Sequence, residues 1–295
     1  MCNLNFMVKK KGNASFLSPL QWATGHSYAR NKDSEGVYLS SMDAVVKSEN
    51  KVDLAPYEDQ IAASNVVAIH ERLSTSGKTL ANGQPFMNER FVFMHNGVLS
   101  LKARKEKQAE KRDLSDSAMF FEEFLKAFEE TEKVPAAIEA AFKKCVTSGS
   151  WSMFLYDKLV DRVYYFKNAS TSMEIAKLKD GSIYGTTSSE NLAFFDVSIK
   201  YELESDKLYF VDLEENSDNE YALYYNPNKL KIEEATYATT TSWGSLKGGY
   251  SGYYGTTYGS SWITNEERFE RLMRLYNQER EDILEEDTRE TGEFI

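Results

Sequence analysis

The sequence has 295 residues, of which 41% are hydrophobic and 13% aromatic, and this composition excludes a disordered chain. Its formal net charge of −11 argues against general binding to nucleic acid, which works by neutralising phosphates with basic residues. The two cysteines are too few for a disulfide framework or a multi-cysteine zinc site, and we expect neither a metal nor a cofactor.

The N-terminal residues predict a strand that holds Cys2 in place, because the apolar residues Leu4, Phe6 and Val8 alternate along it. Cysteine is small enough for a preceding Met1 to be removed, which leaves a thiol and a free α-amine on the same residue. A terminal amine has a pKa of about 7.7 to 8.0, so it can act as a general base near neutral pH. The alternative is an incidental cysteine at a frayed terminus.

Three later stretches predict strands that are bordered by polar turns. Residues 25–39 are typical of a polar turn that leads into a strand, and the apolar runs Val66–Ile69 and Arg90–Met94 predict buried strands. The first run ends near Arg72, and the second ends at Asn96-Gly97, a pair typical of turns. An arginine, an asparagine and a backbone amide at two strand ends suit a substrate that carries a carboxylate and passes through an oxyanion. An ordinary hairpin-rich sheet with polar turns is the alternative.

The middle of the chain predicts two helices followed by a hairpin. Ser115 is a good N-cap for a helix whose phenylalanines form an apolar stripe, and residues 135–145 also have helical character. Residues 151–156 and 162–166 predict the two strands of a hairpin. Strands and helices in this order favour two stacked antiparallel sheets between helices. The basic run 102–112 is most simply a solvated face, and a patch for an anionic partner is the alternative.

The C-terminal part of the chain differs in composition from the rest. Residues 208–211 and 221–225 predict further strands, after which the chain becomes rich in Thr, Ser, Gly and Tyr, as in a flexible linker. The last segment predicts an amphipathic helix that docks either on the domain or on another protein. We therefore expect a domain over residues 1–235, a linker over 236–263 and a helix over 264–295.

Five motifs, in order and at matching spacing, resemble the glutaminase domain of class II glutamine amidotransferases, which are N-terminal-nucleophile hydrolases. The resemblance is strongest over residues 1–195 and implies an α+β fold, a four-layer αββα sandwich of two antiparallel sheets with a C-terminal extension. The motifs are Cys2, the R-N-K-D-S-E-G of residues 30–36, the H-E-R-L-S-T-S-G of 70–77, the N-G-Q-P-F of 82–86 with the H-N-G of 95–97, and the S-D-S of 115–117.

The resemblance implies a catalytic role or a substrate contact for each matching residue. Cys2 is expected to attack the side-chain amide of glutamine, with its own α-amine relaying protons. Asn96, through its side chain, and Gly97, through its backbone amide, are expected to form the oxyanion hole. Arg72 is expected to bind the α-carboxylate of the substrate, and Asp116 its α-ammonium group.

Three further residues are assigned by the same resemblance. Thr75 and Ser76 lie where the family lines the glutamine pocket, and Arg30 is expected to help to position the nucleophile. His70 and His95 are expected to be structural residues at strand ends rather than catalysts.

Four residues depart from the family pattern. Asn3 replaces the glycine that usually follows the nucleophile, Glu71 replaces a small polar residue, Leu73 an aromatic residue and Ser76 a histidine. The sequence therefore predicts an enzyme that hydrolyses glutamine to glutamate and ammonia. Two alternatives stay open, which are hydrolysis of another γ-glutamyl amide and a catalytically idle binding or structural protein with the same fold.

The expected partners follow from the same reading. Glutamine is the expected substrate. Fewer than 100 residues follow the resemblance, which stops at about residue 200, and these are too few for the synthase domain of multidomain relatives, so we expect a separate enzyme to accept the ammonia. The final helix, tethered by the linker, is the candidate docking element. No apolar run of about 18 residues and no signal peptide occurs in the sequence, so we expect a cytoplasmic protein without membrane contacts. The sequence predicts no oligomeric state.

Overall fold

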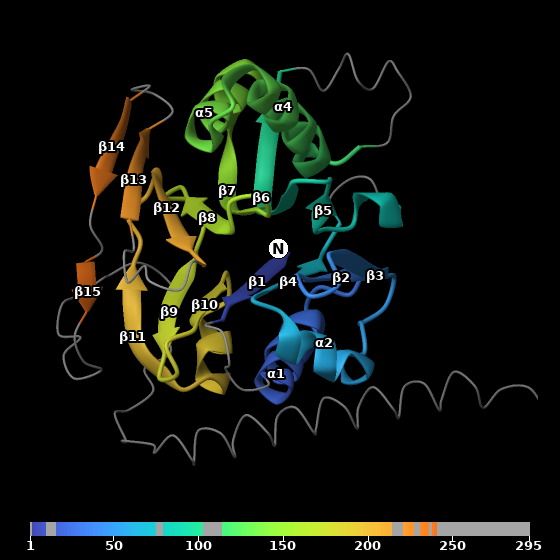
Figure 1. Cartoon of the computed structure of the whole chain (residues 1–295). Coiled ribbons are helices and arrows are strands. Elements are labelled where there is room, and N and C mark those ends of the chain that lie inside the picture. Colours follow the sequence, from blue (N-terminus) through green and yellow to red (C-terminus); the bar gives the residue numbers. More distant parts are fainter. Residues whose placement is uncertain are drawn as a thin grey trace, which may run out of the picture. The chain divides into compact units, whose positions relative to one another are not determined.

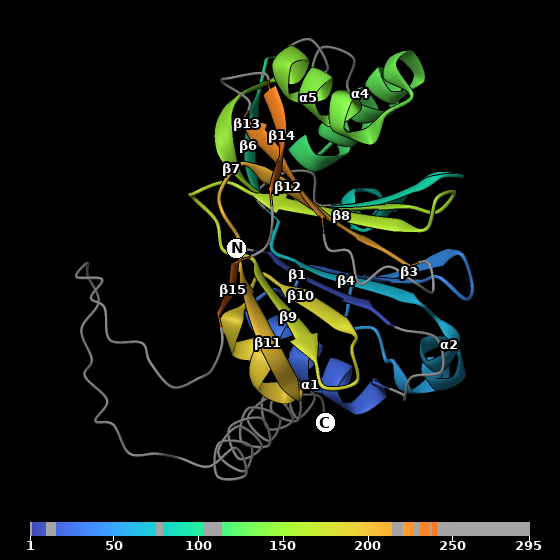
Figure 2. The ribbon, with the colours of Figure 1, turned by 60° about the vertical axis from the view of Figure 1, so that its left-hand side comes forward.

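The structure, a computed structural model, describes residues 2–9, 16–74, 79–102 and 114–213, and the backbone of three further strands between residues 221 and 240. All of these residues belong to one compact unit, residues 1–240. Within this unit two antiparallel sheets are stacked face to face, and helices cover the outer face of each sheet (Figures 1 and 2). The predicted α+β fold of two sheets between helices is confirmed.

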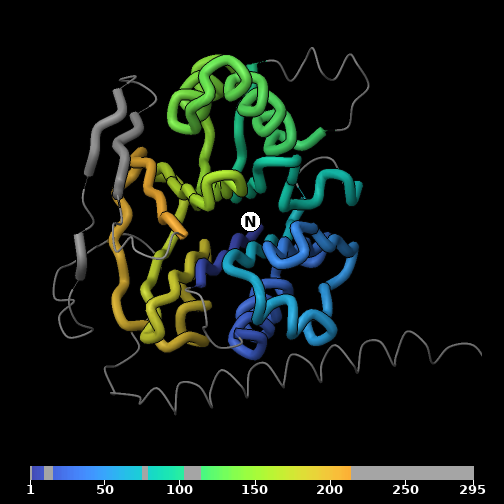
Figure 3. The backbone as a smooth tube through the Cα atoms, in the orientation of Figure 1, coloured from blue at the N-terminus to red at the C-terminus, as the bar shows by residue number. Residues whose placement is uncertain are grey.

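The first sheet carries the N-terminal strand in its interior, as the blue segment in Figure 3 shows. Its eight described strands follow the order β15-β11-β9-β10-β1-β4-β2-β3. In chain order these are β1 (Asn3–Val8), β2 (Ser34–Leu39), β3 (Ala44–Ser48), β4 (Val66–Arg72), β9 (Glu174–Leu178), β10 (Ile183–Thr186), β11 (Val197–Glu202) and β15 (Ala238–Thr240).

The second sheet has seven described strands in the order β14-β13-β12-β8-β7-β6-β5. Its two longest strands, β6 and β7, pair with each other, and β7 also pairs with β8, which confirms the predicted hairpin of residues 151–156 and 162–166. In chain order the strands are β5 (Phe86–Met87), β6 (Phe91–Leu101), β7 (Val146–Asp157), β8 (Arg162–Lys167), β12 (Lys207–Asp212), β13 (Tyr221–Asn226) and β14 (Lys231–Ala235).

The helices form the two outer layers (Figure 1). α1 (Leu17–Tyr28) and α2 (Glu58–Ala63) cover the first sheet, whereas α4 (Asp116–Thr131) and α5 (Val134–Cys145) cover the second. Short 3₁₀ turns are η1 (Ala55–Tyr57), η2 (Leu80–Asn82) and η3 (Ser189–Phe194). None of the described helices is long and apolar enough to cross a membrane.

The described residues form three apolar clusters, one between each pair of adjacent layers. Leu4, Phe6 and Val8 of β1 contribute to the cluster between the sheets, whereas Met7 contributes to the cluster under α1 and α2. This division follows from the two-residue period of a strand, in which successive side chains point to opposite faces. Burial of each large apolar side chain stabilises the fold by about 1.5–3 kcal/mol, so the alternation fixes which residues of β1 point towards each layer.

Several predicted elements are confirmed, including the strand after Cys2, the helix capped by Ser115 and the helix ending at Cys145. The Ser115 side chain accepts a hydrogen bond from the Ala118 N–H, as an N-cap should. The expected turn at the start of residues 25–39 was wrong, because residues 25–28 form the last turn of α1. The predicted final helix lies outside the described residues, as does all of the predicted linker except the short strand β15.

The expected turn at Asn96-Gly97 was also wrong, because both residues lie within the long strand β6. Gly97 keeps its register with β7 although its φ of +142° is one that residues with a side chain rarely adopt. A Cβ at this position would lie 2.0 Å from the carbonyl oxygen of Ser150 on β7. The glycine therefore serves a close approach between two strands rather than a turn.

Candidate active site

Cys2 lies immediately before β1, next to the end of β4. Asn3 is paired with Glu71 in the antiparallel register, which brings Cys2 beside Arg72. The Sγ atom of Cys2 accepts a hydrogen bond from the Leu73 N–H at 3.3 Å, and the Leu73 carbonyl oxygen lies 3.4 Å from it. Burial raises the pKa of the Cys2 thiol, while the Leu73 backbone bond and the charge of Arg72 act in the opposite direction. The thiol thus has a donor and a cation beside it, and both oppose the effect of burial on its pKa.

Arg72 is the last residue of β4, and it is buried despite its charge. It lies on the same face of the strand as Ala68 and His70, and this face points towards the second sheet. A guanidinium in a sparsely hydrated position binds a carboxylate more strongly than one in open water, because it forms two parallel hydrogen bonds in a low dielectric. The arrangement of thiol and guanidinium suits a substrate that carries a carboxylate near its reacting group.

Asn96 and Gly97 lie on β6, in the sheet that faces Cys2. The Asn96 Nδ2 atom donates a hydrogen bond to the Thr187 hydroxyl at 2.9 Å. Its Oδ1 atom is buried and has no hydrogen-bond partner within the described residues. Thr187 also accepts a hydrogen bond from the Leu4 N–H at 3.0 Å, so one hydroxyl joins Asn96 to the strand that begins after Cys2. Side-chain and backbone N–H groups at this place can stabilise an oxyanion.

Asp116 occupies the first turn of α4, where the helix dipole favours a carboxylate. Its Oδ2 atom accepts a hydrogen bond of 2.6 Å from the N–H of Leu99, three residues after Asn96 on β6. This contact fixes the carboxylate beside the strand that carries Asn96 and Gly97. A fixed carboxylate at this end of β6 suits the recognition of an ammonium group.

His70 and His95 are both buried: His70 on β4 contacts the backbone of β6, and the His95 ring on β6 points towards α4. His70 Nε2 lies 3.3 Å from the His95 carbonyl oxygen, and His95 Nδ1 lies 2.8 Å from the Ser117 hydroxyl. The amide of Gln84 accepts a hydrogen bond from the His95 N–H at 2.6 Å and donates one to its carbonyl at 3.0 Å. Burial lowers the pKa of His70 to about 3 and also lowers that of His95, so both rings are neutral at pH 7. These contacts support the structural role that the sequence predicts for both histidines.

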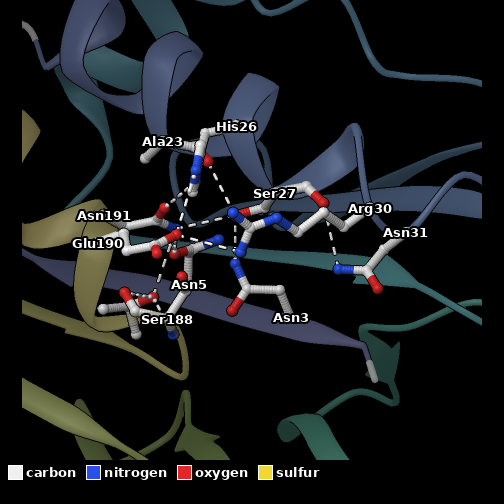
Figure 4. Close-up of polar contacts among 11 residues, drawn as sticks. Asn3, Asn5, Ala23, His26, Ser27, Arg30, Asn31, Ser188, Glu190 and Asn191 are labelled. Carbon is white, nitrogen blue, oxygen red and sulfur yellow. Dashed lines mark hydrogen bonds and ion pairs between the residues drawn. The ribbon is translucent and has the colours of Figure 1, made fainter. Parts of the chain in front are cut away.

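The remaining predicted residues lie apart from this group or outside the described residues. The Arg30 guanidinium forms an ion pair of 3.1 Å with the carboxylate of Glu190 in η3 (Figure 4). The same carboxylate lies 3.2 Å from His26 Nε2. Arg30 therefore belongs to the surface between α1 and η3, under the strand of Cys2, and its assigned role in positioning the nucleophile stays a prediction. Thr75 and Ser76 lie outside the described residues, so their predicted substrate contacts also stay predictions.

Sequence reasoning missed a buried polar network under β1, part of which Figure 4 shows. The Asn3 side chain donates to the Ser27 hydroxyl, and Asn191 Nδ2 donates to both Ser27 and Asn5 at 2.9 Å. A signal was present in the sequence, because Asn3 and Asn5 alternate with the apolar residues of β1 and so had to face a second buried layer. Buried amides need hydrogen-bond partners, and those partners come from residues far away in the sequence.

Comparison with known proteins shows similarity in sequence to one curated protein and in fold to solved structures. No family model matches the sequence. The chain is 25% identical over 167 residues to the glutamine–fructose-6-phosphate aminotransferase (isomerizing) of Helicobacter pylori strain J99, a match that covers 54% of this chain and 28% of the aminotransferase. The chain therefore spans less than a third of this relative.

Two solved structures share the fold. The glutamine phosphoribosylpyrophosphate amidotransferase of B. subtilis, complexed with ADP and GMP, matches with a TM-score of 0.55 and 9% identity over 79% of this chain and 49% of its own. A structure described as the allosteric regulatory enzyme of purine biosynthesis matches with a TM-score of 0.53 and 9% identity, over 72% and 47%. These two structures confirm the predicted fold, and together with the Helicobacter pylori aminotransferase they bear out the predicted resemblance to glutamine amidotransferases.

Proposed function

We propose that this chain, which has the fold and the sequence motifs of the glutaminase domain of class II glutamine amidotransferases, hydrolyses glutamine to glutamate and ammonia through a thioester on Cys2. The observation that carries the proposal is the position of the Cys2 thiol, 3.3 Å from the Leu73 N–H and beside Arg72. The names of the related proteins support glutamine as the source of nitrogen in general. The thioester route and the activity of this chain are our inference from its own residues.

Substrate binding, in this proposal, uses the two opposite charges of the free amino acid. Arg72 binds the α-carboxylate through two parallel hydrogen bonds, and Asp116 binds the α-ammonium group. These two contacts orient the side chain so that its amide carbon faces the Cys2 sulfur atom. Asp116 is already fixed by the 2.6 Å bond from the Leu99 N–H, so little ordering is needed when the substrate binds.

The reaction then proceeds in two steps. The Cys2 sulfur attacks the amide carbon, and the oxygen becomes an oxyanion that accepts hydrogen bonds from Asn96 Nδ2 and the Gly97 N–H. The α-amine of Cys2, which is free once Met1 is removed, takes the thiol proton and passes it to the departing nitrogen, so ammonia and a thioester form. A water molecule, deprotonated by the same amine, hydrolyses the thioester to glutamate and restores the thiol.

The first experiment measures glutamate and ammonia released from glutamine by the purified full-length protein. We expect equal amounts of both products from the wild type and none from Cys2→Ala, because alanine has no nucleophile. Cys145→Ala is the matched control, since Cys145 is a buried residue of the core at the end of α5. Activity that survives in Cys2→Ala would contradict the proposal.

Intact-mass measurement tests the proposed base. We expect the wild type and Cys2→Ser to lack Met1, since serine is also small, but only the wild type to be active. A protein that retains Met1 and hydrolyses glutamine at the same rate would show that the α-amine of Cys2 is not required.

Leu73 supports a second candidate substrate class. Its side chain is exposed next to Cys2, at a position where the family resemblance predicts an aromatic residue. A smaller side chain there leaves room for a substituent on the amide nitrogen, so we include γ-glutamyl amides of small amines as substrates. Faster turnover of these conjugates than of glutamine would assign the chain to γ-glutamyl amide hydrolysis, whereas slower turnover supports glutamine.

A further inference from the structure

A chain of hydrogen bonds with one fixed direction runs from α1 to Asn96. It begins at the backbone carbonyl of Ala23, which can only accept hydrogen bonds (Figure 4). The Ser27 hydroxyl lies 2.9 Å from this carbonyl, so its single hydrogen points towards Ala23. The Ser27 oxygen therefore serves as an acceptor for every other neighbour, which here means the Nδ2 atoms of Asn3 and Asn191.

The orientation of the Asn3 side chain follows from this assignment. With Nδ2 directed at Ser27, the Oδ1 atom of Asn3 points the other way and lies 2.7 Å from the Thr187 hydroxyl. An amide oxygen can only accept, so Thr187 must use its single hydrogen on Asn3. Both side chains are buried, and water is therefore a poor substitute for either bond.

The same logic fixes the amide of Asn96. The Thr187 oxygen, having spent its hydrogen, accepts from the Leu4 N–H at 3.0 Å and from Asn96 at 2.9 Å. Only the Nδ2 atom of Asn96 can donate, so the amide cannot turn its oxygen towards Thr187 without losing this bond. One Asn96 N–H is held by Thr187, and the second N–H has no partner among the described residues, so it can donate to a substrate.

We propose that Asn3 and Thr187 are positioning residues that fix the amide of Asn96 with its nitrogen in the oxyanion hole. The effect of this orientation on catalysis rests on the proposed function. The orientation of the Asn96 amide can be observed whether or not the protein hydrolyses glutamine. It also gives a physical reason for Asn3, which occupies the place of the glycine expected after the nucleophile. A glycine there could not connect Ser27 to Thr187.

The first test observes the Asn96 amide directly and needs no enzymatic activity. Full-length protein is labelled with ¹⁵N in asparagine, and the Asn96 side-chain signals are identified by their loss in Asn96→Asp. In Thr187→Val we expect these signals to shift and to exchange faster with water, because valine keeps the shape but removes the hydroxyl. Thr187→Ser should restore the wild-type signals.

Two further variants separate this effect from general destabilisation. Ser27→Ala acts three hydrogen bonds away from Asn96, in a helix that tolerates alanine, and we expect it to broaden the Asn96 signals. Thr24→Val is the matched control, because Thr24 is buried in the same helix and its hydroxyl donates only to Gln21. Unchanged Asn96 signals in Thr187→Val would overturn the proposal, and if that variant fails to fold, unchanged signals in Ser27→Ala would do so.

The second test measures glutamine hydrolysis, with alkylation of Cys2 by iodoacetamide as a reference reaction that forms no oxyanion. We expect Thr187→Val to lower kcat about 10-fold or more, below the roughly 10²–10³-fold effect of removing an oxyanion donor. KM and the alkylation rate should stay close to those of the wild type. A fall in kcat matched by an equal fall in alkylation would show that Thr187 acts on the nucleophile or the fold instead.

The two tests fail in different ways. If the wild type hydrolyses no glutamine but its Asn96 signals respond to Thr187→Val, the proposed function is wrong and the positioning network is correct. If the wild type is active but the Asn96 signals do not respond, the positioning network is wrong and the proposed function stands.

Discussion

Glu35 and Glu71 lie directly opposite each other on β2 and β4, and both side chains are buried. The Asn5 amide donates to the two carboxylate oxygens of Glu71 at 3.1 and 3.2 Å, while Glu35 accepts from the N–H of Val52. Burial raises the pKa of Glu35 to about 7, although the Val52 bond and Lys51 lower it. Burial and the charge of Glu35 raise the pKa of Glu71 well above its usual range. The pair therefore holds at least one proton below pH 7.

This pair predicts that stability falls as the pH rises from about 5 to 8. A carboxyl group with a raised pKa in the folded state binds more protons there than in the unfolded chain, so it contributes most below the unfolded pKa of about 4.3. The contribution is lost as the pH rises through the folded pKa of about 7. We expect the melting temperature of the wild type to fall over this range, and that of Glu35→Gln to change much less.

The comparison needs a control glutamate that is exposed to solvent rather than buried. Glu129 is exposed on α4, so Glu129→Gln should follow the wild-type pH dependence. Melting temperatures measured by circular dichroism at pH 5, 6, 7 and 8 supply the test. If the melting temperature changes equally with pH in the wild type and in Glu35→Gln, the buried pair binds no extra proton in the folded state.

Arg72→Lys should weaken glutamine binding while leaving the nucleophile in place. Lysine keeps the positive charge but cannot form two parallel hydrogen bonds with a carboxylate. Loss of one charge-assisted bond is worth about 1.5–3 kcal/mol, so we expect KM to rise roughly 10- to 100-fold. Arg90→Lys is the control, since Arg90 forms a paired contact with Asp157 at the start of β6 and not at its catalytic end. Initial rates over a range of glutamine concentrations distinguish the effects, and an unchanged KM would remove Arg72 from the binding site.

Gly97→Ala should abolish activity and destabilise the protein. The new Cβ would lie 2.0 Å from the Ser150 carbonyl oxygen, and the φ of +142° is strained for alanine, at a cost of about 1–3 kcal/mol. Gly149 has a similar φ of +147°, and its Cβ would lie 2.3 Å from the Val98 carbonyl oxygen, so Gly149→Ala strains the same strand pair without altering an oxyanion donor. We expect similar losses of melting temperature but a larger loss of kcat for Gly97→Ala. Equal losses of kcat would mean that strain alone explains both.

Local patterns in the sequence predicted much of the fold. The alternation of Leu4, Phe6 and Val8 and the apolar run Val66–Ile69 each specify a strand through their period, and Ser115 specifies a helix start through its capping bond. The first helix was missed because its residues form no clear apolar stripe, as Gly25-His26-Ser27 illustrates. Asn96-Gly97 was misread as a turn, because the same pair also suits a close approach between strands that depends on Ser150, more than fifty residues later.

The candidate site could be proposed from the sequence where a role belongs to a single residue type. A thiol, a guanidinium and a carboxylate have few substitutes, so Cys2, Arg72 and Asp116 could be identified from motifs. The contacts that orient these groups could not be identified from motifs, because they join residues such as Asn3 and Thr187, which are more than 180 positions apart. Tertiary contacts of this kind leave no periodic trace in the sequence.

The boundary of the active unit yields the last prediction. The three apolar clusters of the described residues lie within residues 2–213, as do Cys2, Arg72, Asn96 and Asp116. The strand β15 pairs with β11 at the edge of the first sheet. A protein ending at residue 240 should therefore fold and hydrolyse glutamine at a rate close to that of the full chain. A protein ending at residue 206 lacks β12, whose Leu208 and Phe210 are buried, and should aggregate or unfold. Circular dichroism and glutamate release measure both properties. An inactive 1–240 protein would show that residues 241–295 complete the site, whereas an active one would assign them to another role, such as the docking of an ammonia-accepting enzyme.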